Sequence, residues 1–303
     1  MKNIVLLLYI LCMSCRAFSQ QGIVVFQTDF GLKDGAVAAM KGVAMGVSPS
    51  LKLFDLTHEI PAYNIWEAAY RLEQTASYWP KGTVFVSVVD PGVGSSRNAI
   101  VMKSKSGHYF VTPDNGTLTL IAASLGIEAI RMIDEKINRL PGSGGSYTFH
   151  GRDVFAYTGA RLAAGKIQFS EVGPLSESPL VKIVYQDAFI NNGMITGFIP
   201  VLDNQYGNVW TNINDSLLQK IHLRYGDSID VMISKNGVPK FSATLAFVKT
   251  FATVGVGQQL TYINSLMNLS ISVNQGNFAE QHGIQSGPGW KVEVNGKRFV
   301  VTP

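Results

Sequence analysis

The chain has 303 residues, 46% of them hydrophobic, and a formal net charge of +4, which is enough for a sizeable core and favours two domains over one. Its basic residues form no run or stripe that would suit a phosphate backbone, so nucleic acid is not an expected partner. The only two cysteines, Cys12 and Cys15, lie near the N-terminus, which excludes thiolate chemistry and disulfides from the remainder of the chain.

Residues 1–19 have the composition of a secretory signal. Lys2 precedes the apolar residues 4–13, and small residues follow up to Ser19. We therefore expect cleavage after Ser19 and an exported protein, periplasmic or secreted. A lipoprotein modified at Cys15 is the weaker alternative. No later segment approaches the roughly 20 apolar residues that a membrane span needs, so we expect no membrane span.

From residue 20 to about residue 186 the chain alternates β-branched runs, polar turns and helix-like segments. The apolar runs predict strands at 23–27, 51–56, 84–89, 99–102 and 109–112. The helical periodicity predicts helices at 35–47, 66–78, 118–125 and 154–164, with Gly165 as a left-handed cap at the end of the last one. This alternation predicts an α/β N-terminal domain with a largely parallel sheet.

After a linker at 175–192 the pattern changes to short strands. Turn residues occur at Asp203-Asn204, Lys235-Asn236-Gly237 and Val294-Asn295-Gly296, and the one helical window is 216–220. Residues 193–303 are therefore predicted to form a smaller all-β, barrel-like C-terminal domain.

Polar turns follow most of the predicted strands of the first domain. In a parallel sheet the carboxyl ends of the strands share one edge, where ligands bind. Each turn by itself is ordinary turn chemistry, and Asp153 suits a helix cap. Together they predict one site, built from turns at 28–31, 55–58, 90–94, 112–116 and 149–153.

Several familiar site motifs are absent from the sequence. There is no phosphate-binding Gly-rich loop, no dinucleotide Gly-x-Gly-x-x-Gly and no Gly-x-Ser-x-Gly nucleophile elbow. The five histidines include no His-Glu-x-x-His pair, so no metal site is expected.

With these turns identified, the chain resembles the S-adenosyl-L-methionine (SAM) hydroxide adenosyltransferase family, the water-using relatives of SAM-dependent fluorinating and chlorinating enzymes. The resemblance covers nearly all of the chain after the signal. It is carried by TDFGLKDGAVAAMKGV (28–43), DLTHEI (55–60), VVDPGVGSSR (88–97), TPDNGTL (112–118), TFHGRDVF (148–155), DNQYGNVWTNI (203–213) and YINSLMNLSISVNQGN (262–277).

The resemblance implies hydrolysis of SAM to adenosine and L-methionine, with Asp90, Arg97 and His150 as the catalytic group. Halogenating relatives carry a different segment at positions 90–94, which favours water over halide. SAM is then the substrate and no cofactor is expected. The resemblance also implies a homotrimer with sites between subunits.

The same resemblance assigns substrate contacts. Asp29 would bind the ribose hydroxyls, Asp34 and Asp203 the methionine ammonium, Asn208 the adenine edge and Ser265 the carboxylate, while Tyr63 and Tyr206 would line the pocket. A halogenase serine and arginine near the amino acid correspond to Ala36 and Leu266 here, which leaves the carboxylate contacts open. Asp34 also suits a cap of the following helix.

The residue chemistry fits a sulfonium substrate. Its leaving group departs as a neutral thioether, so no general acid is required, and the site must orient an oxygen nucleophile. Asp90 and His150 can hold or deprotonate that water, and either could take the proton. Three alternatives stay open: a non-catalytic binding protein for adenosine-like ligands outside the cytoplasm, a halide-using SAM transferase, and cleavage of another adenosine-containing sulfonium.

Overall fold

A computed structural model describes residues 22–297, so the expected signal segment at 1–19 lies outside the described residues. The chain divides into two compact units, one up to Ile183 and one from Val184, and each is described by itself. Within the described part of the chain, no helix is both long and apolar enough to cross a membrane.

The first unit is built on a six-stranded mixed sheet in the order β2-β1-β3-β5-β4-β6. Its strands are β1 (Ile23–Thr28), β2 (Lys52–Thr57), β3 (Val84–Val88), β4 (Ala99–Ser104), β5 (Tyr109–Pro113) and β6 (Ile127–Met132). Strands β2, β1, β3 and β5 pair in parallel, whereas β4 is antiparallel to both β5 and β6. The predicted largely parallel sheet is therefore corrected to a mixed one. Residues 105–108 are too short a connection for a parallel crossover between β4 and β5.

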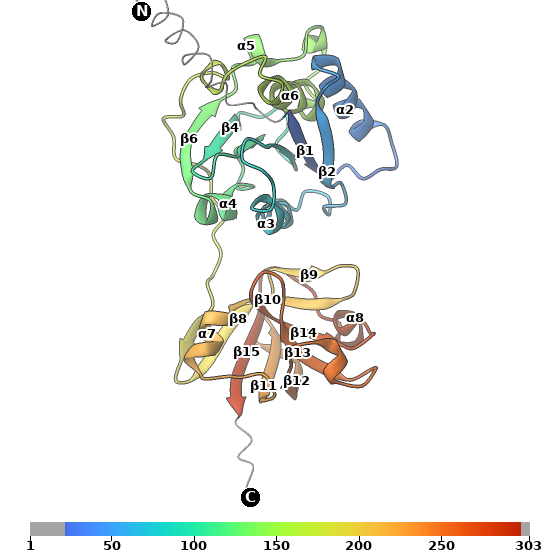
Figure 1. Ribbon diagram of the computed structural model, residues 1–303, viewed down its shortest axis with the longest axis vertical. Helices are drawn as coiled ribbons and strands as arrows, with labels where there is room; N and C mark the ends of the chain where they lie inside the picture. The colour runs from blue at the N-terminus through green and yellow to red at the C-terminus, as the bar shows by residue number, and fades with distance from the viewer. Residues whose placement is uncertain (1–21, 298–303) are drawn as a thin grey trace, which may run out of the picture. The chain divides into compact units, whose positions relative to one another are not determined.

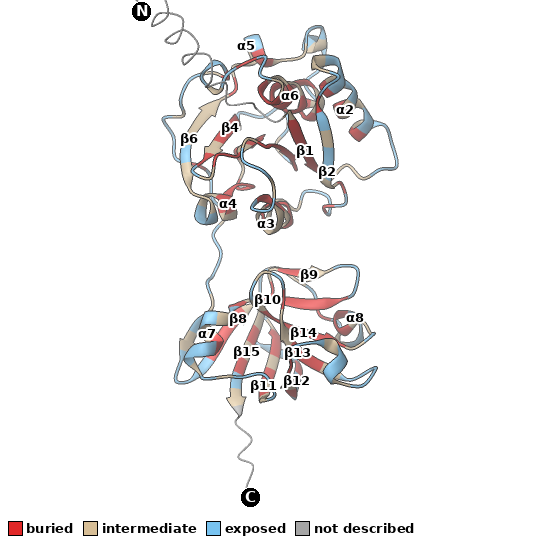
Figure 2. Ribbon diagram, viewed as in Figure 1, coloured by how far each residue is buried: buried red, intermediate tan, exposed pale blue. Residues whose placement is uncertain are grey.

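Helices cover both faces of this sheet (Figure 1). The helical segments are α2 (Ala36–Val47), α3 (Ile65–Ala76), α4 (Thr119–Ser124), α5 (Glu135–Asn138), the 3-10 turn η1 (Ser143–Gly145), the π-helical turn η2 (Gly151–Ala156), α6 (Tyr157–Ala163) and the 3-10 turn η3 (Phe169–Glu171). One hydrophobic core joins Phe26 and Val86 of the sheet to α2, η2 and α6, and a second joins Phe85 to α3 and α4. The central strands are buried while the edge strands β2 and β6 are partly exposed (Figure 2).

The second unit is a curled sheet of nine strands in the order β7-β8-β15-β11-β12-β13-β14-β10-β9. The strands are β7 (Phe189–Asn191), β8 (Met194–Phe198), β9 (Val201–Asp203), β10 (Asn208–Asn214), β11 (Ser228–Lys235), β12 (Val238–Phe247), β13 (Gln259–Ile263), β14 (Asn268–Val273) and β15 (Trp290–Lys297). Curling brings β8 to β10, where the backbone N–H of Phe198 donates to Asn212 Oδ1 at 2.7 Å. The unit is a half-barrel, with β7 and β9 at its ends among the described strands.

Short helical segments complete this unit: α7 (Asp215–Lys220), η4 (Phe251–Thr253) and α8 (Phe278–His282). The turn at Asn236-Gly237 joins β11 to β12 with positive φ at both residues, as a tight hairpin requires. The turn expected at Val294-Asn295-Gly296 is wrong. These residues belong to β15, where Val294 is buried and opposite Val231 of β11. Pairing along the whole of β11 outweighs the local Asn-Gly turn signal.

Candidate active site

The first unit has a cavity of about 270 Å³ at the carboxyl ends of β1 and β3. Its described lining includes two carboxylates and three aromatic rings but no lysine or arginine. Negative charge and aromatic faces together suit a cationic ligand. The lining residues are Asp29, Phe30, Ala62, Tyr63, Val88, Asp90, Val93, Thr148, Phe149, His150 and Gly151.

Asp90, Arg97 and His150 form one hydrogen-bonded group at this cavity. Nε of Arg97 lies 3.0 Å from each carboxylate oxygen of Asp90, and its Nη2 also donates to Asp90 Oδ2. The same Nη2 is 3.0 Å from Nδ1 of His150. The Asp90 and Arg97 side chains are only 5% and 11% exposed, so they form a largely buried, bidentate ion pair. Charge-assisted hydrogen bonds of this type are stronger than hydrogen bonds between neutral groups.

A tight loop after β3 folds Arg97 back onto Asp90. The backbone N–H of Val93 donates to the carbonyl of Asp90, and that of Ser95 donates to the carbonyl of Gly92. A Cβ at Gly92 would lie 3.1 Å from Ser95 Oγ and 3.4 Å from Arg97 Cγ, so glycine leaves room for the arginine to return. The Asp-Pro-Gly turn chemistry thus has a direct role in placing the ion pair.

His150 stands at the start of η2, a π-helical turn of the sort often found at functional sites. His150 is buried, with 6% of its surface exposed. Burial lowers the pKa of His150 below its ordinary value of 6.5, the cations Arg97 and Arg139 lower it further, and the carboxylates Glu135 and Asp90 partly offset this. The ring is therefore uncharged near neutral pH and accepts a hydrogen bond on one nitrogen.

Arg139 is a site residue that the sequence did not reveal. Its Nη2 lies 3.0 Å from Nε2 of His150, on the side of the ring away from Arg97. Its guanidinium pairs with Glu135 Oε2 through Nε at 3.1 Å and Nη2 at 2.6 Å, and it lies over the Tyr147 ring at 4.7 Å. The only local signal is the i,i+4 spacing of Glu135 and Arg139, which is equally typical of any surface helix.

Asp29 lines the cavity directly after β1. Its Oδ2 accepts from the backbone N–H of Tyr63 at 2.9 Å, and Tyr63 has a positive φ of 66° and is 72% exposed. Asp34, in contrast, is exposed and is not among the lining residues; its Oδ1 accepts from the backbone N–H of Ala36 at 2.9 Å. In this unit Asp34 therefore holds the backbone turn just before α2, whose N-cap residue is Gly35, and its contact with the methionine ammonium stays a prediction.

A chain of hydrogen bonds that begins at a buried pair and ends at exposed side chains supports the turn that carries Asp29. Thr28 Oγ1 is 2.8 Å from His58 Nδ1, and His58 Nε2 is 3.0 Å from Asp55 Oδ1. Lys41 Nζ donates to the other Asp55 oxygen at 2.6 Å. His58 is 4% exposed, so this chain is structural and joins the predicted turns at 28–31 and 55–58.

Three of the five predicted turns line the cavity, through Asp29, Asp90 and His150. The turn at 55–58 supports the first of them through His58. The turn at 112–116 instead braces the end of β3, because Asn115 Nδ2 donates to the carbonyl of Val89 at 2.8 Å. The expectation that all five turns line one site is therefore too broad.

The remaining predicted contacts belong to the second unit. Asp203 Oδ2 accepts from Asn208 Nδ2 at 2.9 Å, and Asn208 Oδ1 accepts from Ser272 Oγ. Asn208 is only 5% exposed, whereas Tyr206 is 65% exposed and Ser265 lies exposed in the turn between β13 and β14. Asn208 thus holds the carboxylate of Asp203, and these two contacts use one N–H and one oxygen lone pair of its amide, which leaves one of each for a further partner among residues 22–297 or for a ligand.

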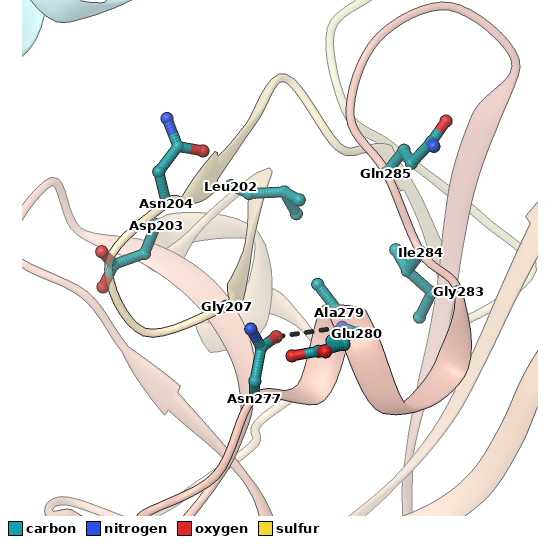
Figure 3. Close-up of a pocket in the computed structure, with 10 residues that line it drawn as sticks. All are labelled: Leu202, Asp203, Asn204, Gly207, Asn277, Ala279, Glu280, Gly283, Ile284 and Gln285. Carbon is teal, nitrogen blue, oxygen red and sulfur yellow. Dashed lines mark hydrogen bonds between the residues drawn. The ribbon is translucent and has the colours of Figure 1, made fainter. Parts of the chain in front are cut away.

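Asp203 also lines a cavity of about 320 Å³ beside α8 (Figure 3). Asn277 caps α8 by accepting from the backbone N–H of Glu280 at 2.9 Å. Gly207 has a φ of +68°, and a Cβ there would lie 1.7 Å from Asn277 Oδ1, so only glycine fits beside this cap. The turn that carries Tyr206 is therefore packed tightly against α8.

The described residues 22–297 contain no group of three or more His, Cys, Asp or Glu side chains placed to hold a metal ion.

Both units match family models. Residues 24–173 match the SAM hydroxide adenosyltransferase N-terminal domain, and residues 197–291 match the C-terminal domain. The chain therefore belongs to the SAM hydroxide adenosyltransferase family.

Relatives and solved structures agree with this membership. The chain is 35% identical to an (R)-S-adenosyl-L-methionine hydrolase of Methanocaldococcus jannaschii, over 76% of this chain and 80% of that protein. It is 34% identical to a Salinispora tropica protein of the same description, over 86% and 94% of the two chains. A fluorinase of an Actinoplanes species is 28% identical, over 88% and 95%. An uncharacterized conserved protein from Thermotoga maritima, solved as a crystal structure, superposes with a TM-score of 0.83 at 34% identity, over 90% and 99%.

Proposed function

We propose that this protein hydrolyses SAM to adenosine and L-methionine. The observation that carries the proposal is the hydrogen-bonded group of Asp90, Arg97 and His150 beside a cavity lined by carboxylates and aromatic rings. Relatives described as (R)-S-adenosyl-L-methionine hydrolases, which match most of the chain, support it. SAM is the substrate and no cofactor takes part.

The reaction is an in-line displacement at the ribose 5′ carbon. A water oxygen forms the new bond to carbon while the carbon–sulfur bond breaks and its electron pair stays on sulfur, which leaves as neutral methionine thioether. One water proton is released. Because the leaving group needs no proton, the main task of the protein is to hold water, 5′ carbon and sulfur in line. Such positioning contributes roughly 7 to 11 kcal/mol.

The cavity supports a role in binding the sulfonium. Asp29 and Asp90 supply negative charge, and the rings of Phe30, Tyr63 and Phe149 supply π faces for the positive sulfur. We assign Asp29 to the ribose hydroxyls, and its position in the cavity lining supports this assignment. In the second unit we assign Asp203 to the methionine ammonium, held by Asn208, whose remaining N–H and lone pair serve the adenine edge. Asp34, Tyr206 and Ser265 keep their assigned contacts with ammonium, pocket and carboxylate.

A halide-using transferase is the second candidate, since fluorinases at 25 to 28% identity also match most of the chain. The discriminating experiment is to incubate residues 20–303 with SAM, with and without a large excess of chloride or fluoride, and to separate the nucleoside products. We expect adenosine and methionine in equal amounts under every condition. A 5′-halo-5′-deoxyadenosine would favour the transferase, and unconsumed SAM with bound adenosine would favour a binding protein.

Export and assembly are proposals that rest on other grounds. The signal-like residues 1–19 support an exported, periplasmic or secreted protein, and N-terminal sequencing of the protein recovered from that compartment would test cleavage after Ser19. The family resemblance supports a homotrimer with sites between subunits. Light scattering of purified protein tests this, and a monomer that is fully active would contradict it.

A further inference from the structure

The imidazole of His150 lies between two arginines. Nη2 of Arg97 is 3.0 Å from Nδ1, and Nη2 of Arg139 is 3.0 Å from Nε2. A guanidinium only donates hydrogen bonds, and a neutral imidazole has one nitrogen that accepts. Only one of these contacts is a hydrogen bond at any moment, and an imidazolium would accept neither.

Arg139 is a fixed cation and not a mobile surface side chain. Its side chain is 11% exposed, is paired with Glu135 through two nitrogens, and lies over the ring of Tyr147. Its Nη1 is buried and has no hydrogen-bond partner within the described residues. The guanidinium therefore stays against Nε2 of His150.

The charges that face His150 balance while the ring is neutral. Arg97 and Arg139 are positive, and Asp90 and Glu135 are negative. A proton on His150 would add an uncompensated charge at the wall of the cavity, next to a substrate that is itself a cation. Burial of the ring acts in the same direction.

Building on the proposed hydrolysis, we propose that Arg139, held by Glu135, is a positioning residue that fixes the His150 ring and keeps it neutral, so that His150 does not receive the proton of the attacking water. When the oxygen has bonded to the 5′ carbon it still carries both protons and is a strong acid. One proton then passes to the carboxylate of Asp90 and on to solvent, which leaves neutral adenosine.

The test is an NMR titration of the His150 ring, identified by the signal that His150→Gln removes. We expect Arg139→Met to raise the pKa of His150, because both a neighbouring cation and a donor to the neutral ring are lost. Arg139→Lys keeps the charge and should leave the ring neutral. The matched control is Arg161→Met, which removes an arginine that donates to Ile137 O and Asn138 Oδ1 beside the same helix. It should leave the titration unchanged.

Glu135→Gln provides a test of opposite sign. It removes a carboxylate that raises the pKa of His150, so that pKa should fall further. If Arg139→Met does not fold, this variant and Arg139→Lys still decide the matter.

Kinetics give an independent readout. Arg139→Met should lose up to about 10²-fold in kcat, mostly on the acidic side, with the acidic limb of kcat/KM moved to higher pH. An unchanged His150 titration and pH profile in Arg139→Met, or a raised pKa in Glu135→Gln, would overturn the inference. The titration needs no turnover, so a wild-type protein that does not hydrolyse SAM would refute the proposed function alone.

Discussion

Removing Asp90 should abolish most of the turnover while sparing adenosine binding. In Asp90→Ala the guanidinium of Arg97, 11% exposed, loses both of its carboxylate contacts and remains beside His150. Breaking a buried ion pair from one side typically costs about 3 to 5 kcal/mol of stability. Loss of a group that holds or deprotonates the water typically costs about 10² to 10⁴ in rate. Both losses should be seen, by urea unfolding and by SAM turnover.

The double variant Asp90→Ala/Arg97→Met separates the two effects. Replacing both members of a buried ion pair with apolar groups is often close to neutral for stability. We therefore expect stability to recover while turnover stays low, with adenosine affinity by calorimetry close to wild type throughout. If the double variant recovers turnover along with stability, or if Asp90→Ala keeps turnover within about tenfold of wild type, the catalytic role of Asp90 is refuted.

Three further predictions concern other parts of the first unit. Asp29→Ala should weaken adenosine binding by about 1.5 to 3 kcal/mol, the value of hydrogen bonds to a charged group, and unchanged affinity by calorimetry would remove Asp29 from the ribose site. His58→Leu leaves Thr28 and Asp55 without their shared partner, so unfolding free energy should fall by about 1 to 3 kcal/mol and KM should rise; urea unfolding with no shift would contradict this. The lowered pKa of His150 means that the unfolded chain binds more protons as pH falls below 6.5, so stability should decline there, and His150→Gln should flatten that part of the pH–stability curve; an equal slope in both proteins would contradict this.

The sequence was sufficient for most elements of the first unit because local signals and burial agree there. The runs at 23–27 and 84–89 are apolar throughout, and the structure buries all of β1 and β3. Strand β6 and helix α5 were not predicted. Strand β6 contains Glu128 and Arg131, and none of its residues is fully buried. Its extended conformation is therefore set by pairing with β4, and the hydrophobic pattern of its own sequence does not reveal it.

The candidate site was predictable only where residues lie in recognisable turns. Asp90 and His150 lie in polar turns that the sequence displays, Arg97 closes the Gly-rich segment after Asp90, and the structure brings the three side chains into contact. Arg139 follows a short helix and has no motif around it, so its contact with His150 arises from the packing of segments eleven residues apart in the chain. For Asp34 the sequence leaves two roles open. An aspartate just before a helix can bind the substrate ammonium, or it can accept from backbone N–H groups at the start of the helix.

The measurement that tests the central claim most directly is hydrolysis of SAM by residues 20–303 in ¹⁸O-labelled water, followed by mass spectrometry of both products. Attack of water at the 5′ carbon predicts adenosine that carries the label on its 5′ oxygen, together with unlabelled methionine. Label-free adenosine would contradict that mechanism, and SAM recovered intact at every enzyme concentration would contradict the proposed activity itself.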